Sequence, residues 1–531
     1  MSHPIDHPVA SHLSGGMGHL HEQRRPSWWA ARATRVKSEP VNKSRVACIG
    51  RWSAASRTNV GLCEDHRLAS ESVKGSAVPV RSERVERAQG IADALTENGV
   101  SAVALTFVDN AGLCRVKAVP TYRLPEAASS GVGMSPVFDH FLVDDTIASG
   151  GSPVGDLRLV PDLERLRVFS AQPGWAWAPV DRYDQAGHPH SGCQRAFARR
   201  LADASSELRL EAQMGFEVEW AVGSEDDDGN FVPVCDGPAY GMGRLTEMGD
   251  YLRAVHETLA RDGIGVLQVH PEYAPGQFEV SFAPSDPLSA ADDVVFVRET
   301  IRAVTIRQGL RASFGPLVTA GGVGNGGHVH IGLRQGGKNL LSSGEGPYGM
   351  TRDGEAFLAA VLRGLPALLA IGAPSPASHA RLVPSHWAGV FQCWGRENRE
   401  AALRLVTGSD GQRAEAANAE IKCFDQAANP YLVVGAILAV GLSGLGDLGR
   451  LPDEVSIDPA TLDEPSRRRL GISRLPNGIK EALVHLEASE VLRSAMGSEL
   501  HDAFVAVRRA EIDTFAGASD RELATRTRWR Y

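Results

Sequence analysis

The chain has few cysteines and no motif that would pair them. Its 531 residues include seven cysteines, none of which belongs to a Cys-x-x-Cys pair. Disulfide scaffolds and zinc fingers depend on closely spaced cysteines, so neither kind of structure is expected. The sequence instead predicts reduced thiols and a cytoplasmic location.

Long apolar runs and an excess of positive charge are also lacking. A membrane-spanning helix needs about 18 or more apolar residues. The nearest match, YLVVGAILAVGLSGLGDLG at 431–449, contains several glycines and follows an Asn-Pro pair, which favours a buried helix. The net charge of −9 and the pI of about 6.0 argue against general nucleic-acid binding. We therefore expect no membrane and no nucleic-acid partner.

What the chain does have is glutamates placed where they could bind divalent cations. Glu217 and Glu219 alternate in GFEVEWAV, so a strand would present both on one face. A solvated face of an amphipathic strand would look the same. Glu272 and Glu279 flank a Pro-Gly turn in HPEYAPGQFEV. That turn can bring the two carboxylates together, and their repulsion favours a cation between them.

A glycine-rich segment and a later glutamate extend this set. His328 and His330 alternate in GNGGHVHIGL, whose glycines allow the backbone to approach a ligand closely. A histidine in such a place is more often structural than a ligand. The segment is neither a Walker A loop nor a dinucleotide fingerprint, because no Lys-Ser/Thr follows and it precedes a strand. Glu420 in AEIKCFD is the last candidate ligand.

Arginines are interleaved with the later segments: Arg381, Arg399, Arg404 and, more loosely placed, Arg396. Carboxylates with a bound metal hold phosphates from one side, while arginines bind anionic substrate and developing charge from the other. The combination predicts phosphoryl transfer.

The order and spacing of these segments resemble the glutamine synthetase family from about residue 84 to residue 531. The segments that carry the resemblance are GLCRVKAVP, GDLRLVPDLERL, GFEVEWAV, HPEYAPGQFEVSFAPSDPLSAADDVVFVRETIR, GNGGHVHIGL, RLVPSHWAGVFQCWGRENREAALRLV and AEIKCFDQAANPYLVVGAILAVGLSGL. The chain is most similar to actinobacterial-type paralogues that join glutamate to amines other than ammonia.

The resemblance implies an α+β protein with two structured parts. We expect a β-grasp-like domain at 83–186 and a glutamine synthetase catalytic domain at 187–531, with an antiparallel half-barrel sheet and helices. Residues 1–82 show little apolar periodicity and no signal-peptide h-region, so we expect a dispensable extension that is disordered or misassigned. The family assembles as rings, usually dodecamers, which implies a homo-oligomer. No tyrosine-containing loop for adenylylation is present.

The resemblance also implies a role for each candidate residue. Two or more Mg²⁺ or Mn²⁺ ions are expected, with Glu219, Glu272 and Glu279 on one metal and Glu217, His328 and Glu420 on another. ATP, a co-substrate, would be contacted by Glu217, His330 and Arg404. Glutamate would be bound by Gly324, His328, Arg381 and Lys422. We expect Arg399, Glu279 and Trp387 to act at the reacting centre, where γ-glutamyl phosphate forms and an amine then displaces phosphate.

Three departures from the family bear on the substrate. Trp387 stands where ammonia-using members carry a glutamate, Lys422 replaces an arginine, and Val323 replaces an asparagine. An indole cannot attract ammonium by charge pairing, but it can line a pocket for an alkyl amine or hold a cationic one. The sequence therefore predicts a γ-glutamyl-amine ligase acting on a primary amine such as a polyamine or ethanolamine. The alternatives are a true glutamine synthetase that uses ammonia and, in a different class, a non-catalytic sensor.

One further feature of the family is an aspartate at the ammonium site. Ammonia-using members place an aspartate of the neighbouring subunit at the ammonium site. The candidates are Asp139, Asp144 and Asp145.

Overall fold

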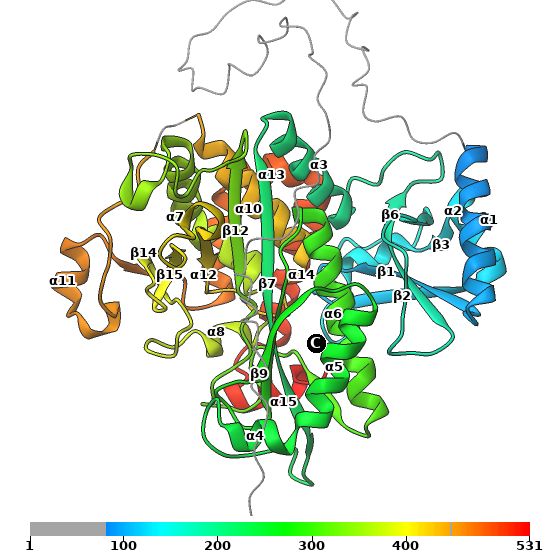
Figure 1. The fold of residues 1–531 in the computed structure, drawn as a ribbon, viewed down its shortest axis with the longest axis horizontal. Coiled ribbons are helices and arrows are strands. Elements are labelled where there is room, and N and C mark those ends of the chain that lie inside the picture. The colour runs from blue at the N-terminus through cyan, green and yellow to red at the C-terminus, as the bar shows by residue number, and fades with distance from the viewer. Residues whose placement is uncertain (1–80, 447–448) are drawn as a thin grey trace, which may run out of the picture.

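The structure, a computed structural model, describes residues 81–446 and 449–531. The expectation of an N-terminal extension at 1–82 thus lies almost entirely outside the described residues. The described chain forms two β-sheets with helices packed on them, and the smaller sheet belongs to the N-terminal part (Figure 1).

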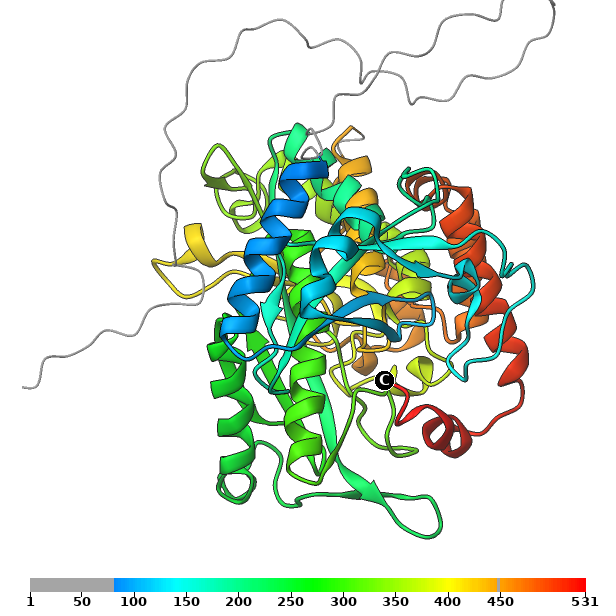
Figure 2. The same cartoon turned by 90° about the vertical axis from the view of Figure 1, so that its right-hand side faces the viewer.

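The N-terminal part is a mixed sheet covered by two helices. Its strands follow the order β2-β1-β6-β4-β3, with β5 beside β6, and β1 pairs with β6 in parallel. The elements are α1 (Arg81–Glu97), β1 (Ala102–Val108), β2 (Cys114–Pro120), α2 (Leu124–Ser130), β3 (Val132–Met134), β4 (Leu157–Pro161), β5 (Arg167–Val168) and β6 (Trp175–Tyr183). Apolar residues of α1, α2, β1 and β6 form one core, and α1 faces the viewer in Figure 2. Its strands fall within residues 83–186, for which the sequence analysis expects a β-grasp-like domain.

The larger sheet has eleven strands in the order β17-β14-β15-β16-β12-β7-β10-β9, with β8 and β11 beside β7 and β13 beside β12. The central strands are β7 (Glu211–Glu225), β9 (Val266–Pro271), β10 (Gln277–Phe282) and β12 (Val329–Gln335). The outer strands are β8 (Phe231–Pro233), β11 (Arg311–Ser313), β13 (Lys338–Asn339), β14 (Phe391–Arg396), β15 (Ala401–Val406), β16 (Asn418–Ile421) and β17 (Ser473–Arg474). This confirms the α+β class, with one correction.

One pair of strands in the larger sheet runs in a direction that was not expected. The expected sheet is antiparallel, but β14 and β15 run parallel although only residues 397–400 connect them. Parallel neighbours usually need a crossover of a dozen or more residues, so this connection is unusually direct. It also carries Arg399, whose guanidinium thereby reaches a cavity that Glu217 and Glu279 of the central strands also line.

Besides the strands of the larger sheet, the described residues from 187 onward form helices, and some of these pack on the sheet. The helices are α3 (Gln194–Glu207), α4 (Met242–Glu247), α5 (Gly249–Arg261), α6 (Pro287–Arg307), α7 (Arg352–Gly372), α8 (Ser378–Arg381), α9 (Arg413–Ala416), α10 (Pro430–Gly444), α11 (Glu464–Arg469), α12 (Ile479–Ala488), α13 (Glu490–Met496), α14 (Ser498–Thr514) and α15 (Asp520–Thr527). Short 3₁₀ helices lie at Thr121–Arg123, Pro136–His140, Pro347–Gly349 and Pro459–Thr461.

The part of the apolar run up to Gly444 forms the buried helix that the sequence predicts, α10. Asn429 caps α10 by accepting from the N–H groups of Tyr431 and Leu432, and Pro430 occupies the first turn. A side chain at Gly441 would collide with the ring of Phe357 on α7, so the glycine permits close helix packing. Among the described residues, α7 alone is long and apolar enough to cross a membrane, and 83% of its most apolar window is buried inside the protein.

Buried ion pairs join the two parts of the molecule. Arg195 on α3 binds Asp292 on α6 (2.8 Å), Asp181 on β6 (2.9 Å) and Asp162 just after β4 (2.8 Å). The hydroxyl of Tyr431 also donates to Asp292 at 2.8 Å. We propose that the boundary between the parts lies near residue 186, between β6 and α3.

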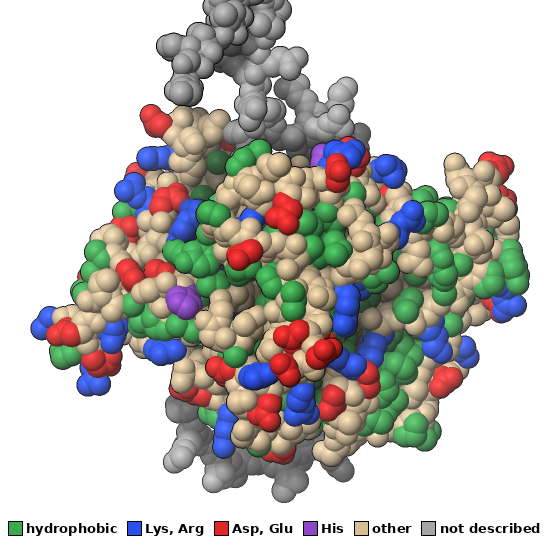
Figure 3. All heavy atoms as spheres, turned by 90° about the horizontal axis from the view of Figure 1, so that it is seen from below, with side chains coloured by type: hydrophobic (Ala, Val, Ile, Leu, Met, Phe, Trp, Pro, Cys, Tyr) green, Lys and Arg blue, Asp and Glu red, His purple; other side chains and the backbone are tan. Residues whose placement is uncertain are grey.

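One face of the surface bears on the expected partners. Seen from below, acidic and basic side chains are interspersed with apolar ones and no broad field of one sign is visible (Figure 3). This face therefore offers no basic stripe for a nucleic-acid backbone.

Candidate active site

The predicted residues converge on one cavity of about 980 Å³ between the central strands and the surrounding loops. Of the predicted residues, the lining includes Glu217, Glu219, Glu272, Glu279, Val323, Gly324, His328, His330, Arg381, Trp387, Arg399, Arg404 and Lys422. Glu420 lies just behind the wall, 2.9 Å from Arg404 and 3.1 Å from Lys422. Arg396 does not line the cavity: its guanidinium lies over the ring of Tyr348.

Strand register explains why these carboxylates meet. Glu219 on β7 is directly opposite Glu279 on β10, and Glu279 is directly opposite His270 on β9. Side chains of opposed residues lie on the same face of a sheet, about 4.5–5.5 Å apart at Cβ. Glu217, two residues earlier on β7, shares that face, while Phe216, Val218 and Trp220 are buried on the other side. The strand interpretation of the Glu-x-Glu pair is therefore confirmed.

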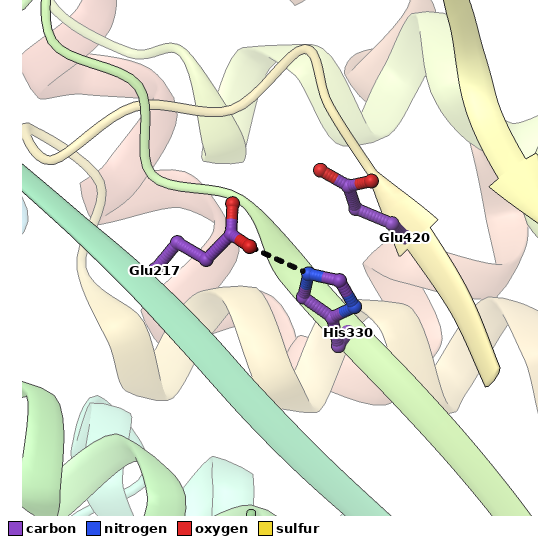
Figure 4. Close-up of side chains that lie close together, drawn as sticks. All are labelled: Glu217, His330 and Glu420. Atoms are coloured by element: carbon purple, nitrogen blue, oxygen red, sulfur yellow. Dashed lines mark hydrogen bonds and ion pairs between the residues drawn. The ribbon is translucent and has the colours of Figure 1, made fainter. Parts of the chain in front are cut away.

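A first ligand cluster consists of Glu217, His330 and Glu420, whose donor atoms all lie within 4.8 Å of one another (Figure 4). Glu217 contacts His330 at 3.2 Å and His328 at 2.9 Å. His328 lies 3.5 Å from Glu420. Asn418 holds the other nitrogen of His330 at 2.8 Å, which fixes the orientation of the ring. Both imidazoles thus flank Glu217; the family resemblance implies that His328 is a metal ligand and that His330 contacts ATP.

A second cluster consists of His270, Glu272 and Glu279, again with donor atoms within 4.8 Å of one another. Tyr240 donates to Glu272 at 2.7 Å. Sequence reasoning missed His270. No local pattern indicates it: β9 ends at Pro271, before Glu272, and His270 joins the cluster because the β9–β10 register places it opposite Glu279.

Glu219 joins the second cluster to the glycine-rich loop. It accepts from the Gln277 side chain and from the Gly326 backbone N–H, both at 2.9 Å. A Cβ at Gly326 would lie 2.7 Å from atoms of both Glu219 and His328. Glycine is therefore required for this close approach of the backbone to two side chains of the cavity.

Glu219 and the carboxylates of the second cluster repel one another. Burial, together with Glu279 and Glu272, raises the pKa of Glu219 to about 8. Burial and the charge of Glu217 raise the pKa of Glu279 to about 7. A divalent cation would remove both penalties, and oxygen donors with an imidazole suit a hard or borderline cation. The residues present therefore fit a metal.

In the first cluster, nearby positive side chains compensate the negative charge of the carboxylates. Burial opposes ionisation of Glu420, but the charges of Lys422 and His330 outweigh it and lower the pKa of Glu420 to about 2. Burial likewise opposes protonation of His330, yet its hydrogen bond to Glu217 and the nearby carboxylates raise its pKa to about 9. Lys422 and protonated His330 therefore supply positive charge at the first cluster.

The raised carboxylate pKa values predict how the metal-free protein responds to pH. The ordinary pKa of these groups is 4.5, so between pH 4.5 and about 8 the folded state binds more protons than the unfolded state. Stability should then fall as pH rises through this window. Thermal unfolding in chelator at pH 5, 6.5 and 8 measures the slope.

Other buried groups titrate in the same window, so the slope needs a reference. Glu279→Gln removes one of the two groups and should flatten the slope. Adding Mg²⁺ or Mn²⁺ to the wild type at pH 8 should raise Tm more than at pH 5. An equal slope in the wild type and the variant would show that Glu279 does not contribute to the pH dependence.

Arg381 on α8 lies at the base of the glycine-rich loop. Its Nη2 donates to the Phe424 carbonyl at 2.9 Å, the residue is 6% exposed, and its Nε has no partner among the described residues. A Cβ at Gly324 would lie 2.8 Å from Cγ of Arg381 and still closer to the Pro316 carbonyl. Gly324 and Arg381 thus form one compact corner of the cavity.

Arg399 and Arg404 border the cavity on the β14–β15 side. Arg404 is tied to Glu420 at 2.9 Å and to Glu397 at 2.7 Å. Within residues 81–446 and 449–531, Arg399 has no hydrogen-bond or ion-pair partner, so its charge is available to an anion. An anionic group entering between these arginines and the carboxylates would face charge of both kinds.

Two of the lining residues form an aromatic wall. Trp387 is 43% exposed, and its ring centroid lies 4.9 Å from that of Tyr273 at an interplanar angle of 58°. Tyr273 follows Glu272 in the β9–β10 turn, so the wall begins next to the second cluster.

The three aspartates considered for the amine site form ion pairs or hydrogen bonds within their own chain. Asp139 is buried, with Arg182 at 2.5 Å and His190 at 2.9 Å, so it cannot serve a neighbouring subunit. Asp145 is paired with Arg115 and Arg530. Asp144 accepts from Thr146 in its own turn.

Comparisons with known proteins agree with this geometry. The family model described as "Glutamine synthetase, catalytic domain" matches residues 191–525. The chain is 50% identical over 456 residues to the gamma-glutamylpolyamine synthetase GlnA3 of Streptomyces coelicolor, covering 85% of this chain and 98% of that protein. It is 29% identical over 433 residues to a glutamine synthetase of Clostridium saccharobutylicum, covering 80% and 95%.

Solved structures show the same similarity. A novel glutamine synthase homologue superposes with a TM-score of 0.73 at 30% identity, covering 81% of this chain and 99% of that one. An ADP complex of GmaS superposes with a TM-score of 0.71 at 26% identity, covering 81% and 97%.

Proposed function

The chain belongs to the glutamine synthetase family, and from that premise we propose that its amine substrate is a polyamine. It is an ATP-dependent ligase that forms a γ-glutamyl amide from glutamate and a primary amine. The aromatic wall of Trp387 and Tyr273 is the observation that carries the choice of amine.

The reaction needs two steps because a carboxylate is a poor acyl donor. An oxygen of the glutamate γ-carboxylate attacks the γ-phosphorus of ATP, the bond to the ADP oxygen breaks, and γ-glutamyl phosphate forms. The amine nitrogen then attacks the acyl carbon, the bond to the phosphate oxygen breaks, and phosphate leaves while the nitrogen loses a proton. We propose that Arg399 and Arg404, which both line the cavity, stabilise charge on the phosphoryl oxygens.

We propose that Mg²⁺ or Mn²⁺ ions, two or more, are held by the two carboxylate clusters. Family members generally depend on a divalent metal and ATP. Such ions neutralise phosphate oxygens and polarise the phosphorus. Glu217, Glu420 and the imidazoles of His328 and His330 supply donors at one end, and His270, Glu219, Glu272 and Glu279 supply them at the other.

Glutamate would bind at the corner formed by Gly324 and Arg381. A guanidinium suits a carboxylate because it can donate two parallel hydrogen bonds. Nε of Arg381, which has no partner in the part of the chain that the structure describes, supports this role. Lys422, at the Glu420 end of the cavity, keeps a positive charge near the reacting γ-carboxylate.

The amine end supports an organic amine over ammonium. Trp387 carries no charge, so it does not pair with ammonium as a carboxylate would. Two aromatic rings can pack on a methylene chain and attract a cationic amine through their faces. The 50% identity to a γ-glutamylpolyamine synthetase points the same way.

The experiment is an amine panel. Glutamate-dependent ATP turnover with Mg²⁺ is measured with ammonium, ethanolamine, putrescine, spermidine and spermine. We expect kcat/KM for the polyamines to exceed that for ammonium by at least about 10-fold, since a pocket built for an alkyl chain binds a small ion poorly. Reactions without glutamate are the control. Turnover with ammonium alone would contradict the proposal.

Assembly and location extend the proposal. We propose a ring-shaped homo-oligomer, a dodecamer by family resemblance, in the cytoplasm. The five cysteines in the described part of the chain are free, which suits a reducing compartment.

A further inference from the structure

The turn that carries Trp387 has an unusual backbone. Ser385 has φ 59°, Trp387 has φ 56° and Gly389 has φ 62°. Residues with side chains rarely adopt this left-handed region, and never at no cost. Two such residues within one short turn persist only if surrounding groups hold them there.

Two carboxylates from other parts of the chain hold this turn. Oε1 of Glu400 accepts from the backbone N–H of Trp387 at 2.8 Å, and Oδ2 of Asp458 accepts from the Ser385 hydroxyl at 3.0 Å. Glu400 is only 7% exposed, so its hydrogen bond to the peptide is shielded from water. Burial raises the pKa of Glu400, while the N–H groups of Trp387 and Ser385 act against that rise.

Glu400 does not itself line the cavity, but the residue before it in the chain and the residue whose N–H it binds both do. These two residues are Arg399 and Trp387. Residues 397–400 also form the short connection between the parallel strands β14 and β15, which anchors Glu400 at both ends.

The opposite half of the aromatic wall is held in a similar way. The N–H of Tyr273 donates to Oε2 of Glu272 at 2.7 Å. The backbone N–H of each residue of the wall therefore donates to a buried carboxylate, and the two ring centroids lie 4.9 Å apart.

We infer that Glu400 is a positioning residue that sets the place of Trp387 and thereby the selectivity for the amine. The inference rests on the proposed function, because it concerns the same cavity. Glu400 acts through the Trp387 backbone and does not touch the substrate.

The test compares Glu400→Ala with Glu400→Gln. Alanine removes the acceptor, so KM for spermidine should rise by about 10- to 100-fold, since a displacement of about 1 Å in a positioning group has effects of this size. KM for glutamate and for ATP should change by less than about twofold. Glutamine keeps an oxygen where Oε1 lies, so Glu400→Gln should restore KM for spermidine to near the wild-type value.

Glu355→Ala is the matched control. Glu355 is also a buried carboxylate, 5% exposed, whose Oε1 accepts from the backbone N–H of Leu451 at 3.3 Å. It does not line the cavity. This variant should lower Tm but leave KM for spermidine unchanged.

The outcomes separate the inference from the proposed function. If the wild type turns over ammonium alone, the proposed function fails and the inference fails with it. If the wild type uses spermidine and Glu400→Ala leaves its KM unchanged, only the inference is overturned. It is also overturned if Glu400→Gln is as defective as Glu400→Ala, or if all three KM values rise together.

Discussion

Glutamate-dependent ATP turnover should be lost when Glu279 is replaced with glutamine, with kcat falling by on the order of 10³-fold. Glu279 lies at the centre of a row of opposed residues, between Glu219 and His270. Glutamine keeps the shape but supplies no negative charge to a divalent cation. The loss should therefore appear in the chemical step as well as in metal affinity, and steady-state kinetics over a range of Mg²⁺ concentrations measures both.

Unfolding measurements show whether such a loss reflects the metal site. Without metal, Glu279→Gln should be at least as stable as the wild type at pH 8, because the raised pKa values of Glu219 and Glu279 mark a repulsion that the variant removes. With metal, the wild type should gain more in Tm than the variant. Glu257→Gln, at an exposed position of α5, is the control for replacing a glutamate. Full turnover in Glu279→Gln would contradict the assignment, and a wild type without turnover would favour the sensor alternative.

The second large effect concerns stability. Asp292→Ala should lower the free energy of unfolding by about 3–5 kcal/mol, because it leaves buried partners without their counter-charge. Asp292 is fully buried and binds Arg195 at 2.8 Å, Arg165 at 3.2 Å and the Tyr431 hydroxyl at 2.8 Å. Equilibrium urea unfolding, followed by tryptophan fluorescence and circular dichroism, gives the difference.

An exposed ion pair provides the comparison. Asp250 pairs with Arg253 one turn along α5, and its side chain is 95% exposed. Asp250→Ala should cost no more than about 0.5 kcal/mol, since exposed pairs contribute little. Because Arg195 also binds Asp162 and Asp181 of the N-terminal part, Asp292→Ala should make the two parts unfold less cooperatively. A cost below about 1 kcal/mol, well under the range for breaking a buried pair, would show that the network is not a structural link.

Much of the site could be predicted because its ligands lie on regular strands. The alternation of Glu217 and Glu219 and the Pro-Gly turn after Glu272 indicate shared faces directly, and the structure brings these residues together. The convergence of the glycine-rich loop with Arg381 followed from family resemblance, and the space around Gly324 gives its physical reason.

What could not be predicted depends on pairing between distant segments. His270 enters a cluster because the β9–β10 register places it opposite Glu279. Glu400 reaches Trp387 only through a left-handed turn that no local pattern indicates. Asp139 looked available in the sequence, yet Arg182, 43 residues later, neutralises it. The parallel pairing of β14 and β15 likewise contradicts the usual rule for so short a connection.

The position of Glu217 and Glu219 on β7 has a consequence for how such a protein can change. Because residues two apart on a strand lie roughly 7 Å apart, their spacing fixes the distance between these two carboxylates of the cavity. Inserting one residue between them would turn one carboxylate into the core, so this spacing tolerates no variation in length. Tyr273 and Trp387, in contrast, lie outside the strands, so they can vary without altering the spacing of Glu217 and Glu219. Acceptor choice can therefore diversify while the phosphoryl chemistry stays constant.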